Sequence, residues 1–540
     1  MNRTRGVKSV LYSVLCYALV ATFLLVILGL SGCDEDTLRL SAAYHHELFA
    51  PPDEATDIAV TITITNEGTV GCEKVILLLE DINRSWVRND LAPGDSVEVV
   101  WDGRDGENNL VPAGQYTYAV TGFQNASPPH GLVDTRTGTI GFDQMITVPD
   151  SNLESAIRGA IGKPSGNIYR LNLEGVTGLS ASGRGIVDLT GLEYAIGLAT
   201  LDLGGNEISD IAPLAGLTGL TTLKLSGNPL SDIAPLAGLT GLTTLDLSGN
   251  QISDIAPLTG LTSLTTLDLT ENPLSDISPL AGLTSLTALN LARNPISDIS
   301  PLANLASLTT LDLGRNEISE IAGLANLTSL ITLDLGVNQI SDISPLADLT
   351  SLTTLELGGN QVNSVAALAN LISLTTLHLG GNQISEIAGL ANLTSLITLD
   401  LSVNQISDIA ALADLTNLTT LALSVNQITD TAPLADLTSL TTLDLGRNQI
   451  SDIAPLANLT GLTTLDLGVN QISDIAPLAD LTNLTTLDLG GNQISDIAPL
   501  VANTGLTRGD TVDLRYNPLS ATALYTHIPQ LETRGVTVLH

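Results

Sequence analysis

The sequence of 540 residues predicts an α/β solenoid, a stack of short coils, preceded by a small β-sandwich. Three observations carry this prediction. Asparagine recurs every 22 residues from Asn206 to Asn492, and Leu and Ile occupy fixed positions around each of these asparagines. Hydrophobic residues make up 44 % of the chain but aromatic residues only 3 %. Stacked coils explain this composition, because branched aliphatic side chains pack on copies of themselves and need no large rings.

The charge of the chain limits its function. It carries 57 Asp and Glu against 20 Lys and Arg, a formal net charge of -37. Nucleic acid is excluded as a partner, because phosphate backbones are bound by Lys and Arg. The apolar content is too high for a disordered acidic protein, so the charge must lie on a folded surface.

Residues 1–32 are predicted to be a signal peptide. A basic start is followed by an apolar stretch from Val10 to Leu30 and by Leu30-Ser31-Gly32-Cys33. This ending resembles the bacterial lipobox, and the resemblance implies cleavage before Cys33, diacylglycerol on its sulfur and a membrane anchor. An uncleaved transmembrane anchor remains the alternative, since 21 apolar residues are long enough to span a bilayer. Residues 33–56 are expected to form a tether.

Residues 57–148 are predicted to form the β-sandwich, with strands at 59–65, 75–79 and 97–101 separated by turn residues. The segments 101–106 and 111–118 resemble the terminal hairpin of the immunoglobulin-like domain of flagellar hook-capping proteins. That resemblance implies a spacer. A calcium loop at Asp102, Asp105 and Glu107 is the alternative, but these acids lack the regular calcium-loop spacing, so turn chemistry is favoured.

The region 196–508 contains the coils. Each follows the pattern of Leu484, Leu487, Leu489, Asn492 and Ile494, in which a short strand points two Leu inward and the Asn then turns inward to bond backbone groups. This pattern is the leucine-rich repeat signature, and its 22-residue length resembles the internalin-type repeats of bacterial surface proteins. Twenty-two residues are too few for a full outer α-helix, so a 3₁₀ turn is expected on the convex face.

Two flanking regions are predicted to cap the array. The segment 149–195 is expected to hold a short amphipathic helix, with a capping box within Asp150 to Glu154, and a degenerate first repeat. The helix resembles the internalin N-terminal cap. Residues 509–540 are expected to cover the last coil. Within the coils, an Asp such as Asp496 recurs just before the outer turn and is expected to cap it.

The exposed strand positions of the concave face carry a column of acids four residues before each Asn. Such a column is self-repelling, and two interpretations stay open. In the first, it recruits Ca²⁺ or Mg²⁺, with Asp400, Asp444, Asp466 and Asp488 as the candidate Ca²⁺ ligands, or a basic partner. In the second, which is favoured because each acid has Thr and Gly or Ser beside it and not further carboxylates, it is a solvated face that keeps the array soluble.

The part of the concave face whose exposed residues vary most between coils is predicted to contact a partner. Its residues are Glu271, Asn290, Arg293, Asp312, Arg315, Glu356 and His378. The predicted function is protein–protein interaction or adhesion by a monomeric, exported lipoprotein of the bacterial envelope, with a protein or surface glycan as partner. The alternative is a structural spacer without a dedicated ligand, since no Phe, Tyr or Trp occurs between Tyr194 and Tyr516. No catalytic motif is found, and no cofactor other than Ca²⁺ is expected.

Overall fold

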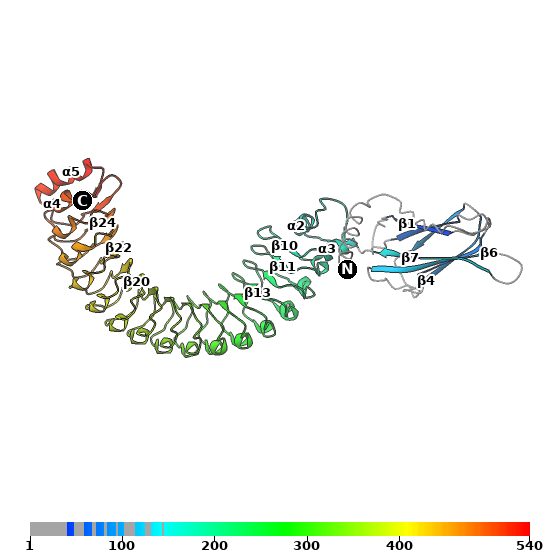
Figure 1. The fold of residues 1–540 in the computed structure, drawn as a ribbon, viewed down its shortest axis with the longest axis horizontal. Helices are drawn as coiled ribbons and strands as arrows, with labels where there is room; N and C mark the ends of the chain where they lie inside the picture. The colour runs from blue at the N-terminus through cyan, green and yellow to red at the C-terminus, as the bar shows by residue number, and fades with distance from the viewer. Residues whose placement is uncertain are drawn as a thin grey trace, which may run out of the picture. The chain divides into compact units, whose positions relative to one another are not determined.

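The computed structural model describes residues 40–47, 59–66, 72–79, 84–92, 95–101, 114–124, 131–142 and 145–540 (Figure 1). The predicted signal peptide, Cys33 and the hairpin turn at 102–113 lie outside the described residues. The chain divides into two compact units. The first contains the described residues up to Thr147 together with 163–175, and the second contains 148–162 and 176–540.

The first unit contains two antiparallel sheets. One has the order β1-β2-β5 and the other β4-β3-β6-β7. Their strands are β1 (Leu40–Glu47), β2 (Ala59–Asn66), β3 (Cys72–Leu79), β4 (Arg84–Leu91), β5 (Ser96–Trp101), β6 (Gly114–Gln124) and β7 (Gly131–Phe142). Each sheet buries aliphatic side chains, such as Ile64 in β2 and Leu77 in β3. That the two sheets pack face to face as a sandwich stays a prediction.

Strand β1 corrects the predicted tether. Residues 40–47 pair along their whole length with β2, from Leu40 opposite Asn66 to Glu47 opposite Ala59. A polar tether through 33–56 is therefore wrong for this segment, because its backbone is bonded into a sheet. The first unit also holds the short antiparallel pair β8 (Met145–Ile146) and β9 (Ile168–Tyr169), followed by α3 (Arg170–Glu174).

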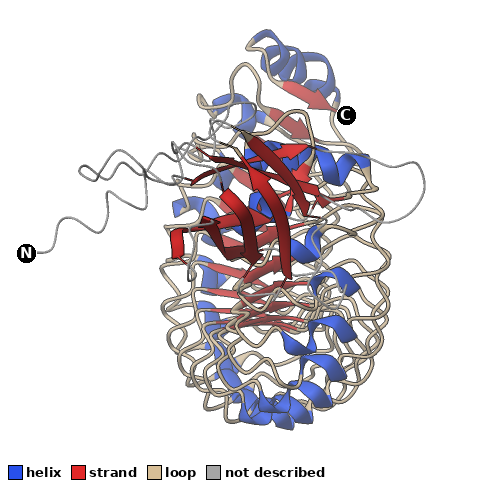
Figure 2. Cartoon of the chain, turned by 90° about the vertical axis from the view of Figure 1, so that its right-hand side faces the viewer, coloured by secondary structure: helices blue, strands red, loops and turns tan. Residues whose placement is uncertain are grey.

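The second unit is a solenoid built on one parallel sheet of 17 strands in chain order. Identical positions pair between coils, so Leu333 of one strand lies opposite Leu355 of the next. The strands line the concave side of the curved array and the short helices its convex side (Figure 1, Figure 2). The strands are β10 (Gly178–Ser180), β11 (Thr200–Asp202), β12 (Thr222–Lys224), β13 (Thr244–Asp246), β14 (Thr266–Asp268), β15 (Ala288–Asn290), β16 (Thr310–Asp312), β17 (Thr332–Asp334), β18 (Thr354–Glu356), β19 (Thr376–His378), β20 (Thr398–Asp400), β21 (Thr420–Ala422), β22 (Thr442–Asp444), β23 (Thr464–Asp466), β24 (Thr486–Asp488), β25 (Thr511–Asp513) and β26 (Thr537–Leu539).

The convex side carries the predicted 3₁₀ turns, which confirms that part of the fold. An Asp before most turns accepts a hydrogen bond from the turn; Asp210 Oδ1, for example, lies 2.8 Å from Ala212 N. The Asp stands one residue before the expected cap position, because the cap residue itself is the inward-pointing Ile211. The turns are η2 (Leu192–Tyr194), η3 (Ala212–Leu214), η4 (Ala234–Gly238), η5 (Ala256–Leu258), η6 (Ser278–Gly282), η7 (Ser300–Asn304), η8 (Ala322–Leu324), η9 (Ser344–Leu346), η10 (Ala366–Leu368), η11 (Ala388–Leu390), η12 (Ala410–Leu412), η13 (Ala432–Leu434), η14 (Ala454–Asn458) and η15 (Ala476–Leu478), with α4 (Ala498–Ala502) in the last coil.

The asparagine column forms the predicted buried ladder. Asn492 is 6 % exposed; its Nδ2 donates to Leu489 O at 3.0 Å and to Leu467 O of the preceding coil at 2.9 Å. Its Oδ1 accepts from Ile472 N at 3.0 Å. Thirteen of the fourteen asparagines are buried and Asn404 is half-buried. Because every polar atom of the side chain is paired, the ladder links each coil to the one before it.

Both ends of the array are helical. At the N-terminal end α2 (Ser151–Ile161) is capped by Asp150, which accepts from Asn152 N and Leu153 N and, through its other oxygen, from Val187 N at 2.8 Å. The capping box predicted within 150–154 is only partly formed: Asp150 is the cap, but the side chain of Glu154 pairs with Arg158 and not with the backbone of the cap residue.

At the C-terminal end the segments η16 (Ala523–His527) and α5 (Ile528–Thr533) precede β26, the last strand of the sheet. Within the described ranges, no helix combines the length and apolar character needed to cross a bilayer.

Candidate interaction site on the concave face

The acids of the concave face have a structural role that the sequence analysis did not anticipate. Asp334, at the end of β17, accepts a hydrogen bond on Oδ1 from Gly336 N at 2.7 Å, and Asp312 accepts from Gly314 N at 2.9 Å. Asn290 makes the same bond to Ala292 N at 3.1 Å. These are Asx turns, in which the side chain replaces a backbone acceptor where the strand ends. The acidic column is therefore partly a column of turn residues.

The residue just before each ladder asparagine has a left-handed backbone conformation. In six coils this residue is Gly, the residue that tolerates positive φ best. In the other eight it is not Gly, and φ lies between 53° and 59°; these residues are Glu271, Arg293, Arg315, Val337, Val403, Val425, Arg447 and Val469. The conformation costs an L-residue about 1 kcal/mol or more. We call these fourteen positions the left-handed column.

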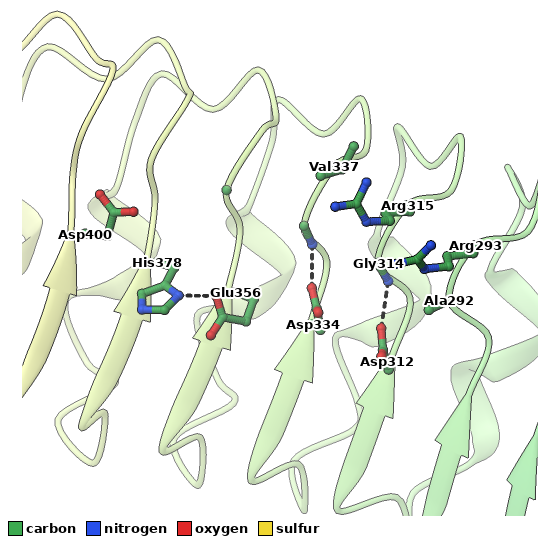
Figure 3. Close-up of a pocket in the computed structure, with 12 residues that line it drawn as sticks. Ala292, Arg293, Asp312, Gly314, Arg315, Asp334, Val337, Glu356, His378 and Asp400 are labelled. Carbon is green, nitrogen blue, oxygen red and sulfur yellow. Dashed lines mark hydrogen bonds and ion pairs between the residues drawn. The ribbon is translucent and has the colours of Figure 1, made fainter. Parts of the chain in front are cut away.

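A hollow of about 570 Å³ lies on the concave face across consecutive coils (Figure 3). It is lined by Ala292, Arg293, Asp312, Gly314, Arg315, Asp334, Gly336, Val337, Glu356, Gly358, His378 and Asp400. The residue two positions after the acidic column is Gly in four successive coils from Gly314 to Gly380, where the coils on either side have Ala292 and Ser402. Three of these glycines, Gly314, Gly336 and Gly358, line the hollow.

The upper edge of the hollow carries Arg293 and Arg315, which are exposed and stand at the same position of neighbouring coils. Both side chains extend toward the following coil (Figure 3). No ion pair or side-chain hydrogen bond to either guanidinium is found within the described part of the chain. Between residues 199 and 505 there are 30 Asp and Glu but only four Lys and Arg, so this hollow contains half of the basic residues of the coils.

The lower part of the hollow carries half-buried acids. Burial raises the pKa of Asp312; the bond from Gly314 N lowers it, and the neighbouring charges of Asp334 and Asp268 raise it further. The net effect is a raised pKa, so the ionised carboxyl is held in an unfavourable setting.

Glu356 and His378 form a contact across two coils, with Nδ1 of the imidazole 2.5 Å from Oε2 of the carboxylate (Figure 3). Burial raises the pKa of Glu356, the charge of His378 and its hydrogen bond lower it, and Asp334 and Asp400 raise it again. The pKa of Glu356 is raised overall.

The structure brings most of the predicted partner-contact residues together. Five of the seven line the hollow: Arg293, Asp312, Arg315, Glu356 and His378. Asn290 lies in the strand beside Asp312, outside the lining, and Glu271 stands one coil before Arg293 in the left-handed column. Asp334 and Val337 also line the hollow, and the sequence analysis did not select them.

The residues considered for Ca²⁺ are distributed differently. Asp400 lines the hollow, whereas Asp444, Asp466 and Asp488 follow one another on β22, β23 and β24, beyond Ala422. Among the described residues, no three His, Cys, Asp or Glu side chains are grouped so as to hold a metal ion. Each of these acids uses Oδ1 in its own Asx turn, as in the 2.8 Å bond from Gly468 N to Asp466.

Comparison with known proteins identifies the family. The family model of leucine-rich repeats in two copies matches residues 196–238, 240–282, 284–326, 328–370, 372–414, 416–458 and 460–502. The structure is similar to an internalin (InlF) from Listeria monocytogenes, with 39 % identity, a TM-score of 0.55 and coverage of 62 % of this chain and 94 % of that chain. The chain is an internalin-type leucine-rich repeat protein.

Two further solved structures are similar to this internalin-type protein. A leucine-rich repeat protein from Leptospira interrogans has 27 % identity and a TM-score of 0.63, covering 69 % of this chain and 97 % of that chain. The functional domain of the internalin InlJ from Listeria monocytogenes shares the fold at 24 % identity and a TM-score of 0.62, covering 69 % and 82 %. That domain includes a cysteine ladder, whereas the present chain has no cysteine after Cys72. No curated protein matched the sequence.

Proposed function

We propose that this internalin-type protein binds a protein partner through its concave strand face, with the hollow as the centre of contact. The observation that carries the proposal is the pair Arg293 and Arg315. Both are exposed, both lack a protein partner within the described residues, and both hold a backbone conformation that favours Gly. Six other residues of the left-handed column share this conformation, so what distinguishes the pair is its place at the edge of the hollow.

The chemistry of the hollow supports binding rather than catalysis. His378 is half-exposed and in contact with a carboxylate, and the described residues around it include no Ser, Thr or Cys nucleophile in the hollow. Guanidinium groups beside carboxylates suit the recognition of a charged protein surface. We therefore propose a non-catalytic role.

We further propose that the protein is exported and anchored to the bacterial envelope through diacylglycerol on Cys33. The support is the sequence: a basic start, an apolar stretch and Leu-Ser-Gly before the cysteine. In this proposal the two sheets of the first unit form an immunoglobulin-like spacer. Metabolic labelling with a radioactive fatty acid tests the anchor, and loss of the label from Cys33→Ser is the expected result.

A structural spacer without a ligand is the second candidate. The observation in its favour is that no aromatic residue occurs between Tyr194 and Tyr516, since strong protein interfaces usually contain aromatic anchors.

A comparative pull-down from envelope and cell-surface fractions separates the two candidates. The full chain is compared with a double variant, Arg293→Gly with Arg315→Gly, and with Arg447→Gly as the matched control from the same column. Binding predicts a protein retained by the wild type and the control but lost from the double variant. A spacer predicts the same retained proteins in all three.

A further inference from the structure

The hollow presents two kinds of charge in two separate rows. Arg293 and Arg315 of the left-handed column lie along its upper edge, and Asp312 and Asp334 lie at the strand ends below (Figure 3). In each coil the acid precedes the left-handed position by three residues, so the two rows run in register along the array.

Each aspartate of the lower row still has one oxygen available. Oδ1 of Asp312 and of Asp334 accepts a backbone N–H, and no protein hydrogen bond to either Oδ2 is found among the described residues. The two guanidiniums of the upper row are equally unpaired within that part of the chain. A ligand therefore meets a row of free donors beside a row of free acceptors.

A ligand that carries charges of only one sign fits this arrangement poorly. A purely acidic ligand is attracted by the arginines but repelled by Asp312, Asp334, Glu356 and Asp400, and a purely basic ligand meets the opposite problem. A segment with both signs satisfies both rows. No Phe, Tyr or Trp lines the hollow, so the large aromatic faces on which sugar rings commonly stack are missing from its lining.

We propose that the hollow recognises a short segment of a partner protein in which a Lys or Arg stands close to an Asp or Glu. The acidic side chain of the partner is held by Arg293 and Arg315, and guanidinium groups bind a carboxylate through two parallel hydrogen bonds. The basic side chain of the partner contacts Oδ2 of Asp312 and Asp334. This inference rests on the proposed function and adds the chemistry of the partner.

The partner's basic group also stabilises carboxylates whose ionisation is unfavourable in the free protein. The pKa values of Asp312 and Glu356 are raised by burial and by neighbouring acids. A cation placed beside these carboxylates stabilises their ionised forms, because an opposite charge nearby favours the charged state. Binding of the mixed-charge segment is therefore coupled to proton release at any pH at which these carboxyls are partly protonated.

Selection from a library of short random peptides displayed on phage, carried out on the full chain, tests the inference. The expected result is enrichment of peptides that contain both a basic and an acidic residue. With Arg293→Gly and Arg315→Gly the acidic residue is no longer selected, and with Asp312→Asn and Asp334→Asn the basic residue is no longer selected.

Both sets of variants have natural precedents in the chain, which separates lost recognition from misfolding. Glycine occupies the left-handed column at Gly359, and Asn290 makes the Asx turn in the acidic column. Arg447→Gly and Asp444→Asn, at the same two columns outside the hollow, serve as matched controls and leave the selection unchanged.

Four results overturn the inference. Enriched peptides with charges of one sign, or an enrichment unaffected by the variants of the hollow, contradict the mixed-charge segment while the proposed concave-face binding stands. Retention of the chain on a sulfated polysaccharide in preference to any peptide replaces the protein segment with a glycan. In the last case, the selection enriches no peptide, but the pull-down captures a partner whose retention depends on Arg293 and Arg315. This result rules out a short segment as the recognised unit.

Discussion

Arg293 and Arg315 stand at the same position of two consecutive coils, and both have a left-handed backbone, with φ of 57° and 59°. Their N–H groups donate to the carbonyl oxygens of Gly314 and Gly336 in the following coils, at 2.8 and 2.7 Å. The conformation is thus fixed by the coil-to-coil bonds and not by the side chain. Any residue at this position adopts it, and any residue other than Gly is strained.

Replacing a strained arginine outside the hollow by glycine is expected to stabilise the protein. Arg447→Gly removes the left-handed strain of an L-residue at φ 57° and should raise the free energy of unfolding by up to about 1 kcal/mol. Arg447→Ala is the control, because it removes the same guanidinium but keeps the strain. Urea denaturation of the three proteins gives the comparison, and equal stability of the two variants contradicts the strain.

Removing one asparagine of the buried ladder should be costly. Asn338→Ala leaves the buried Ile318 N without its partner at 3.0 Å. It also removes one of the two donors of Leu313 O and of Leu335 O, which keep Asn316 Nδ2 and Asn360 Nδ2. The expected loss is about 2 kcal/mol, since one buried N–H is left unsatisfied and two further hydrogen bonds are lost. The exposed Asn326, in the preceding coil, is the control, where alanine should cost less than about 0.5 kcal/mol. Similar losses at both positions in thermal or urea unfolding count against the ladder.

The acidic column should make stability depend on pH in a definite direction. Burial raises the pKa of Asp466 above its ordinary value of 3.8; the bond from Gly468 N and the charge of Arg447 lower it, while Asp444 and Asp488 raise it. The folded state therefore binds this proton more tightly than the unfolded state, and the resulting stability is present below pH 3.8 and lost as the pH rises through the raised value.

Asp466→Asn keeps the turn acceptor and removes the charge, so its stability relative to the wild type should increase from acidic to neutral pH. The comparison variant is Asp276→Asn, because bonds from the backbone and side chain of Ser278 lower the pKa of Asp276. The stability that ionised Asp276 provides is present above pH 3.8 and lost below it, so this variant should become less stable relative to the wild type as the pH rises. Urea unfolding across this range gives both slopes, and slopes of equal sign reject the assignment.

Calcium is expected to leave the melting temperature unchanged at millimolar concentration. Asp444, Asp466 and Asp488 each use one oxygen in an Asx turn, and no group of three potential ligands is found in the described part of the chain. A Ca²⁺ site generally needs six to eight oxygens. Thermal melting with Ca²⁺, with Mg²⁺ and with a chelator is the measurement. A rise in melting temperature specific to Ca²⁺ revives the cation interpretation of the acidic column.

The repeat itself was predictable from sequence, and the backbone details of the concave face were not. The spacing of Asn206 to Asn492 determines the coil, its strand and the buried ladder, because each is a consequence of one period. The role of Asp334 as a turn residue depends on a bond to the backbone two residues later, which side-chain periodicity does not reveal. A signal was nevertheless present: the frequent Gly, Ser or Thr two residues after the acid.

The sequence shows that the left-handed column varies from coil to coil but not that its residues share one backbone conformation. Six of its residues are glycines, such as Gly205 and Gly491, which indicates positive φ. The other eight are not glycine, so the sequence does not indicate positive φ for the whole column. The variability of this column was nevertheless the reason for predicting Arg293 and Arg315 as contact residues. The structure places five of the predicted contact residues along one hollow.

The central claim is that Arg293 and Arg315 are kept for binding and against stability. The most direct test measures both properties on one protein, the full chain with Arg293→Gly and Arg315→Gly. The account predicts that the free energy of unfolding rises by up to about 2 kcal/mol, the sum of two relieved strains, while retention of the partner is lost. Retention equal to that of the wild type in the stabilised double variant contradicts the claim.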